Sequence, residues 1–157
     1  MLEIAVVNRQ KNKPLSTKKF TFWVRKILQS LGWKQAKISV VLVNNVGIKR
    51  LHRKYLKMDS ATDVLAFGPS KRSVSIRDQR FLGEVVASVE MAARVGPQFG
   101  NPWDIELLLY VCHGVLHLMG YRDSSRALKT QMDKKQNQIL CKMLGQKWQS
   151  KKQKPLF

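Results

Sequence analysis

Residues 113–123, HGVLHLMGYRD, constrain the path of the chain more tightly than any other stretch of the sequence. His113 and His117 are four residues apart, so a helix would place both side chains on one face, one turn from each other. Gly120 comes three residues later and predicts the end of that helix. A chain that turns back at Gly120 can bring Asp123 alongside the two histidines. The stretch therefore predicts a helix, a glycine turn and a return segment that gathers three polar side chains.

The spacing of these side chains, H-x3-H-x5-D, matches the outline of the extended zincin pattern. Three protein ligands leave a fourth position open, which is typical of catalytic rather than structural zinc. Each residue also has an ordinary interpretation: a surface histidine pair, a helix C-cap at Gly120, and an N-cap at Asp123 for the following helix. Their conjunction favours the metal, so we expect one Zn²⁺ per chain, bound by His113, His117 and Asp123.

Other side chains are weaker candidates for the third ligand. Glu106 precedes His113 by seven residues, roughly 10 Å along a helix axis at 1.5 Å per residue. His52 falls on a different expected helix, where a structural role or an RNA contact fits better, and Cys112 falls among apolar positions. A zincin peptidase carries a glutamate base directly after its first histidine, but this chain has Gly114 there. A peptidase is therefore disfavoured.

Apolar residues recur elsewhere with periods of two and of 3.6, which predicts both strands and helices. Strands are expected at residues 2–6 and 38–42 and over TDVLAF (62–67) and LGEVVAS (82–88). Helices are expected at residues 17–31, 45–55, 90–95, 102–119 and 125–144. The expected N-terminal residues are Ser16 or Thr17, Asn44 or Asn45, and Asn101 as a cap with Pro102 at the first helical position. These elements predict an α+β fold.

We expect a single domain over residues 1–148, a small mixed sheet packed with helices, in which the metal-binding helix is followed by a C-terminal helix. Residues 68–80 are expected to form a loop, and residues 149–157 a basic, mobile tail. On the histidine helix, one predicted stripe is apolar: Ile105, Leu108, Leu109, Cys112, Leu116 and Met119. A separate face carries Glu106, Tyr110, His113 and His117. The last helix is expected to pack Leu128, Met132, Ile139 and Met143 against the core.

The net charge of the chain is +19, from 29 Lys and Arg against 10 Asp and Glu. The excess lies in residues 1–60 and 124–157, whereas residues 61–123, which contain the histidine motif, are nearly neutral. A neutral centre between two basic segments suits a polyanion bound across a reactive site, so we expect contact with nucleic acid or the ribosome. A hydrolase of small phosphoesters is disfavoured, because such a substrate does not require so large a charge.

The apolar runs, the N-terminal residues and the two cysteines bear on the cellular location. No run approaches the roughly 18 apolar residues of a membrane-spanning helix, and the start MLEIAVVN lacks the features of a secretory signal. We therefore expect a cytoplasmic protein without membrane contact. Cys112 and Cys141 are expected to be reduced thiols rather than a disulfide.

With these residues in view, the chain resembles the YbeY family of bacterial and organellar metal-dependent endoribonucleases over roughly residues 38–145. The family motif H-G-x-L-H-L-x-G-Y-D-H is similar to HGVLHLMGYRD. The upstream stretch YLKMDSATDVLAFG resembles a tyrosine-containing segment that leads to P-T-D-V-L-S-F-P in the family. Between them, LGEVVAS resembles the family strand L-G-D-I-x-I-S. Three motifs in the same order make the resemblance specific.

The resemblance implies a single-strand-specific, zinc-dependent endoribonuclease acting in rRNA maturation, at the 16S rRNA 3′ end, and in ribosome quality control. Its implied partners are single-stranded RNA, rRNA and ribosomal particles. The alternative is a non-catalytic RNA-binding assembly factor whose metal site is structural or vestigial. Whether water or the RNA 2′-hydroxyl would attack is left open by the sequence, as are the physiological metal, the cleavage position and the oligomeric state.

Three positions depart from the family pattern. The third family ligand is histidine, where this chain has Asp123, and the family aspartate before it is Arg122 here. The family arginine after the tyrosine, thought to serve catalysis or RNA binding, is Leu56. The catalytic residue is thus unknown, and the candidate cations are Arg53, Lys57 and Arg122, with Lys54 as a further neighbour of Leu56.

Overall fold

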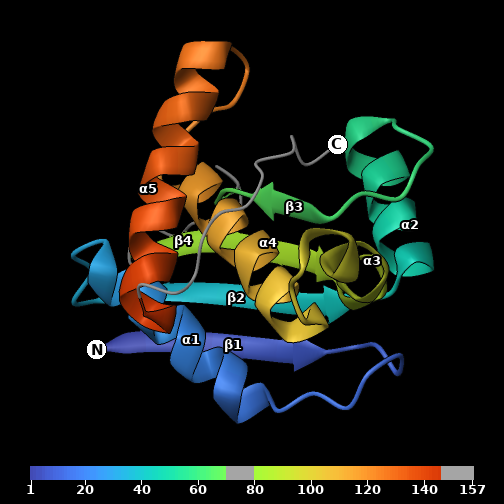
Figure 1. The fold of residues 1–157 in the computed structure, drawn as a ribbon, viewed down its shortest axis with the longest axis horizontal. Coiled ribbons are helices and arrows are strands. Elements are labelled where there is room, and N and C mark those ends of the chain that lie inside the picture. Colours follow the sequence, from blue (N-terminus) through green and yellow to red (C-terminus); the bar gives the residue numbers. More distant parts are fainter. Residues whose placement is uncertain (70–79, 146–157) are drawn as a thin grey trace.

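The computed structural model describes residues 1–69 and 80–145, and within them a four-stranded sheet is packed with helices (Figure 1). The strands are β1 (Leu2–Asn8), β2 (Ala36–Val43), β3 (Val64–Phe67) and β4 (Phe81–Ser88). The helices are α1 (Thr17–Ser30), α2 (Asn45–Leu56), α3 (Val89–Val95), the short 3-10 helix η1 (Gly96–Phe99), α4 (Trp103–Leu118) and α5 (Arg126–Leu144). The expected α+β class and the order of the elements are confirmed.

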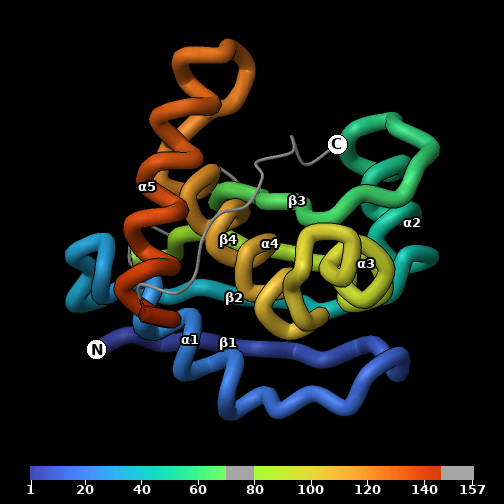
Figure 2. The backbone as a smooth tube through the Cα atoms, in the orientation of Figure 1, coloured from blue at the N-terminus to red at the C-terminus, as the bar shows by residue number. Residues whose placement is uncertain are grey.

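The sheet is mixed, with strand order β1-β2-β4-β3. β1, β2 and β4 run parallel, and β3 pairs antiparallel with β4. The central strand β2 is apolar on both faces, because each face is covered. Val40 and Leu42 belong to the core cluster that includes residues of α1, α3, α4 and α5, whereas Val41 and Val43 belong to a second cluster with Ile48 of α2. Figure 2 shows the path that wraps this sheet, with β1 at one edge and β3 at the other.

Four helices begin at a side-chain cap, which satisfies an amide that has no partner within the helix. The oxygens of Ser16, Asn44, Ser88 and Ser125 accept hydrogen bonds from the third residue after each cap. The N-cap of α1 is therefore Ser16 rather than Thr17, and the N-cap of α2 is Asn44 rather than Asn45. At α5 the cap is Ser125, so Asp123 lies outside the helix and does not cap it.

The predicted start of α4 is wrong by one position. Pro102 is the N-cap and Trp103 the first helical residue, because the ψ of Pro102 is 155°, in the extended range. Asn101 is not the cap. Its side-chain amide donates instead to Oε1 of Glu106, at 2.9 Å, and so connects the incoming chain to the first turn of α4.

The apolar stripe predicted for α4 is only part of the buried surface of this helix, since α4 lies at the centre of the core. It contacts α1, α3, α5, β3 and β4, and its middle is buried all round. Glu106, Tyr110 and His113 are buried like the apolar residues, whereas Ile105 and Leu109 of the predicted stripe are only half-buried. A burial stripe cannot be derived from periodicity when neighbours cover every side.

Packing of α5 agrees with the prediction except at one end. Met132 and Ile139 are buried and Met143 is half-buried, but Leu128 is 37% exposed. The first turn of α5 extends beyond the core, as Figure 1 shows, which agrees with the exposure of Leu128.

Three further expectations concern the loop and the tail, membrane-spanning helices, and the two cysteines. Most of the expected loop, residues 70–79, and the expected tail, residues 149–157, lie outside the described residues. Among the described helices, none combines the length and apolar character that crossing a membrane requires. Cys112 and Cys141 are not joined in a disulfide, and burial raises the pKa of Cys112 to about 12.

Candidate metal centre

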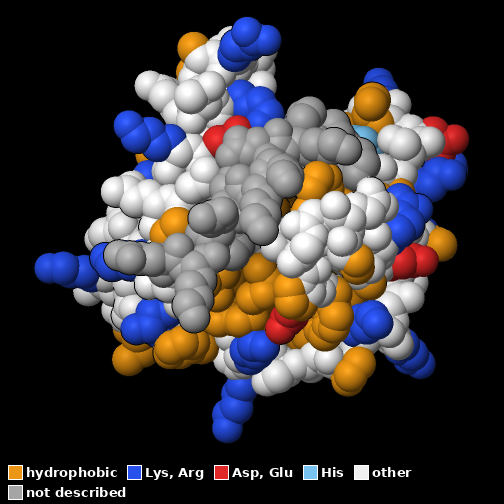
Figure 3. All heavy atoms as spheres, in the orientation of Figure 1, with side chains coloured by type: hydrophobic (Ala, Val, Ile, Leu, Met, Phe, Trp, Pro, Cys, Tyr) orange, Lys and Arg blue, Asp and Glu red, His pale blue; other side chains and the backbone are white. Residues whose placement is uncertain are grey.

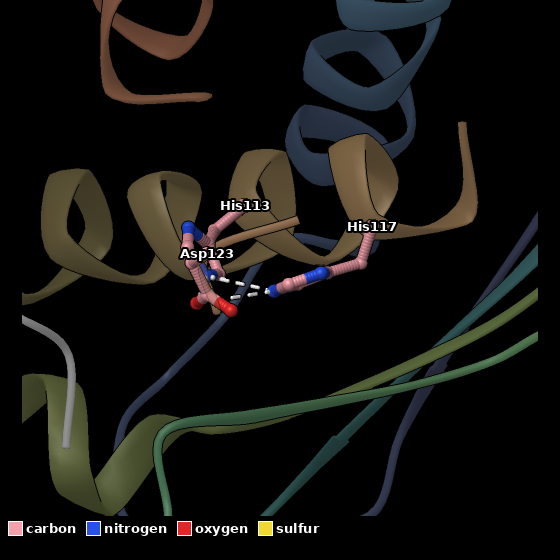
Figure 4. Close-up of side chains that lie close together, drawn as sticks. All are labelled: His113, His117 and Asp123. Carbon is pink, nitrogen blue, oxygen red and sulfur yellow. Dashed lines mark hydrogen bonds and ion pairs between the residues drawn. The ribbon is translucent and has the colours of Figure 1, made fainter. Parts of the chain in front are cut away.

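His113 and His117 project from the last two turns of α4 and converge with Asp123 from the segment that follows it (Figure 4). The two Nε2 atoms lie 3.1 Å apart. Each lies 3.6 Å from Oδ2 of Asp123. One ligand atom from each residue falls within 4.8 Å of the others, so this group could hold a metal ion. The three residues predicted from spacing are therefore brought together.

The turn after α4 makes this convergence possible. Gly120 has a φ of +97°, which lies in the left-handed region that favours glycine. Its amide donates to the carbonyl of His117, and the amide of Tyr121 donates to the carbonyl of Leu116. These two bonds form a Schellman motif, which ends the helix and reverses the chain. Asp123 then returns past the helix end with its side chain 45% exposed.

The Nδ1 atom of each histidine lies within hydrogen-bond distance of an acceptor oxygen. Nδ1 of His117 lies 3.2 Å from the backbone carbonyl of Tyr121, which can only accept, so this nitrogen carries the hydrogen. Nδ1 of His113 lies 3.2 Å from Oε1 of Gln136, on α5. When Nδ1 carries the hydrogen in both rings, both Nε2 atoms present lone pairs to each other and to a carboxylate. A donor set of two imidazole nitrogens and one carboxylate oxygen fits Zn²⁺.

Burial favours the neutral form of His113. Its pKa is lowered from the ordinary value of 6.5, first by burial and then by the neighbouring imidazole of His117, while the charges of Asp123 and Asp133 oppose the shift. A neutral imidazole keeps the Nε2 lone pair available for a metal. The site therefore combines a buried histidine, a half-buried one and an exposed carboxylate, which leaves it open on the carboxylate side.

Gly114 faces the sheet rather than the metal centre. An added Cβ would lie 2.7 Å from a methyl of Val85 and 3.0 Å from a methyl of Val64. A glutamate at this position would be forced against β3 and β4. The geometry thus agrees with the sequence in disfavouring a zincin peptidase.

The three candidate cations are not equivalent. Arg53 lies in the last turn of α2 and is paired with Asp59 through both Nε and Nη2, and this pairing lowers the pKa of Asp59. Lys57 is the exposed C-cap of α2. Figure 1 shows α2 at one side of the molecule and the turn between α4 and α5 at the other. Arg122 lies in that turn, next to Asp123, and is exposed.

A second group of polar side chains, formed by Asp63, Glu106 and Tyr110, is buried in the core. Asp63, at the start of β3, is 3% exposed, and burial raises its pKa to about 6. Its Oδ1 accepts from the amide of Val64 at 2.7 Å, but Oδ2 has no partner among the described residues. Burial raises the pKa of the Tyr110 hydroxyl, and the charges of Glu106 and Asp63 raise it further. Glu106 bonds to Asn101 here, which agrees with its exclusion as a ligand.

Gln136 is the site residue that the sequence did not reveal. A signal was available, since Gln136 interrupts the buried stripe of α5 formed by Met132, Ile139 and Leu140. A buried polar side chain in such a stripe requires a hydrogen-bond partner. The partner, His113, is 23 residues away in the chain and could not be inferred from helical spacing.

Comparisons with known proteins agree on one family. A family model described as Endoribonuclease YbeY matches residues 5–144. Proteins named Endoribonuclease YbeY from Geobacter metallireducens and Geobacter sulfurreducens are each 31% identical over 142 residues, which cover 89% of this chain and 95% of theirs. The solution structure of a Thermotoga maritima protein has a TM-score of 0.59 at 22% identity and covers 98% of this chain and 100% of that one, which supports the fold.

Proposed function

The chain belongs to the YbeY family of endoribonucleases, which makes it an RNA-cleaving hydrolase, and we propose that it cleaves single-stranded ribosomal RNA with one zinc ion. The proposed process is rRNA maturation at the 16S rRNA 3′ end, together with ribosome quality control. Ribosomal particles in the cytoplasm are its proposed partners. Family membership supports the class of reaction, and the metal centre supports the proposed chemistry.

We propose that His113, His117 and Asp123 are the zinc ligands. One observation carries this proposal: acceptors occupy both Nδ1 atoms, while both Nε2 atoms and a carboxylate oxygen converge. Two lone pairs 3.1 Å apart repel each other unless a proton or a cation lies between them. When bound, Zn²⁺ supplies Lewis acidity to a phosphodiester.

The surface around the site would bind and orient the RNA. Figure 3 shows Lys and Arg side chains around the rim of one face, with fewer acidic side chains among them. Arg122 follows the turn beside Asp123 and is the cation best placed to stabilise charge on the phosphoryl group. Arg53, already paired with Asp59, and Lys57 would contact RNA further along the strand.

The alternative is a non-catalytic, RNA-binding ribosome assembly factor with a structural or vestigial metal. Leu56 favours this alternative, because it replaces the family arginine and is 54% exposed, so no apolar packing explains it. The carboxylate ligand alone does not favour it, since carboxylates occur in catalytic zinc sites.

A nuclease assay separates the two functions. Purified protein is incubated with a labelled single-stranded RNA and its duplex, after chelation and after restoring Zn²⁺. The proposal predicts cleavage of the single strand only, lost on chelation, recovered with Zn²⁺ and abolished by Asp123→Ala. Leu56→Arg should increase kcat/KM, since it restores a cation at an exposed position. Binding of RNA and zinc without cleavage, in wild type and in Leu56→Arg, would establish the assembly factor instead.

A further inference from the structure

Gln136 connects α5 to the metal centre. Its side chain is 94% buried, between Met132 and Ile139, and its Oε1 lies 3.2 Å from Nδ1 of His113. A buried amide without a hydrogen-bond partner costs free energy, and the bond to His113 supplies a partner. No other described side chain is hydrogen-bonded to this nitrogen.

The hydrogen on His113 has two possible positions, with opposite consequences. If Nε2 carried it, Nε2 would donate to the lone pair on Nε2 of His117, 3.1 Å away, and the two imidazoles would close on each other. If Nδ1 carries it, the hydrogen bonds to Oε1 of Gln136 and Nε2 stays free. His117 has no such choice, because the Tyr121 carbonyl fixes its hydrogen on Nδ1.

We propose that Gln136 is a positioning residue that holds His113 in the Nδ1–H form and so keeps the centre open for a metal. This inference rests on the proposed role of His113 as a ligand, but not on RNA cleavage. In this proposal α5 orients the buried ligand His113 through Gln136, whereas the backbone carbonyl of Tyr121 orients the half-buried ligand His117.

Metal affinity tests this role without RNA. Zn²⁺ affinity is measured by chelator competition, and Co²⁺ binding by its visible spectrum, for wild type, Gln136→Met and Gln136→Glu. Gln136→Met keeps the length of the side chain but removes the acceptor, so affinity should fall roughly 10- to 100-fold. Gln136→Glu keeps an acceptor and should bind at least as tightly as wild type. Gln131→Met, at an exposed position of the same helix, is the matched control and should change nothing.

Wild-type affinity in folded Gln136→Met, or a loss in Gln136→Glu as large as in Gln136→Met, would overturn the proposal. A second measurement needs no variant. Long-range ¹H–¹⁵N correlation spectra of the metal-free wild type should show the neutral ring of His113 protonated on Nδ1, with His117 as internal reference. Protonation of His113 on Nε2 would overturn the proposal even if Gln136→Met failed to fold. Neither outcome depends on whether the protein cleaves RNA.

Discussion

Gly114 of α4 lies so close to Val85 of β4 that a Cβ on the glycine would come within 2.7 Å of a valine methyl. The helix that carries the metal centre is therefore seated directly on the sheet at the residue next to His113. This contact explains the glycine of the HG pair by packing rather than by chemistry. It also restricts the rotation of α4, the helix on which His113 and His117 converge with Asp123.

We predict that Gly114→Ala destabilises the fold. Alanine gains up to about 1 kcal/mol of helix propensity, but overpacking in a closed core costs about 1–3 kcal/mol and should prevail. Urea denaturation measures the balance. Gly68→Ala is the control, since an added Cβ there meets nothing within 4 Å. Greater stability of Gly114→Ala than of wild type would show that the contact relaxes at little cost.

Much of this architecture could be predicted from local patterns. The alternation along β1, the caps Ser16 and Asn44, and the turn at Gly120 each depend on neighbours in sequence, and the structure confirms them. The burial of α4 could not be predicted in this way, because it depends on which elements surround the helix. For the same reason, the contact between His113 and Gln136 is visible only in the fold.

A second prediction concerns the metal ligands. Asp123→Ala should weaken Zn²⁺ binding by roughly 100-fold, since the apparent binding energies of structural zinc sites with four protein ligands, about 10–16 kcal/mol, average about 2.5–4 kcal/mol per ligand. Asp123→His should bind as tightly as wild type or more tightly, because it restores the family ligand set. Chelator competition measures both. Glu106→Ala is the control and should leave affinity unchanged. Undiminished Zn²⁺ binding by Asp123→Ala would show that the third ligand is another residue.

The third prediction concerns RNA affinity and salt. A protein that neutralises about six phosphates of a single strand loses roughly 300-fold in affinity from 50 to 200 mM salt, through counterion release. The net charge of +19 predicts a steep dependence of this kind. Fluorescence anisotropy with a labelled single-stranded RNA gives the slope. A dissociation constant that is independent of salt would contradict an electrostatic interface.

α5 should be essential for folding. Truncation before Ser125 removes Met132, Ile139 and Leu140 from the core, each worth about 1.5–3 kcal/mol of burial. Their sum is comparable with the whole stability of an ordinary domain. Circular dichroism should show an unfolded chain. A chain ending at residue 148, the proposed domain boundary, should melt like wild type. A folded chain without α5 would show that this helix is an accessory.

The last prediction follows from the buried carboxyl of Asp63. Burial raises its pKa from 3.8 to about 6, so the folded state holds a proton that the unfolded state releases between these pH values. Stability from this group is therefore greatest below pH 4 and declines as the pH rises to about 6. Asp63→Asn keeps the Oδ1 acceptor for Val64 and removes the cost of ionisation.

The variant should therefore be more stable than wild type at pH 7.5 by about 3 kcal/mol, at 1.36 kcal/mol per pKa unit, and nearly equal to it at pH 4. Urea denaturation of both proteins at the two pH values measures the difference. An equal effect of Asp63→Asn at both pH values would mean that its proton is not coupled to folding. In that case the unpartnered Oδ2 must gain a hydrogen-bond donor when the folded protein is hydrated.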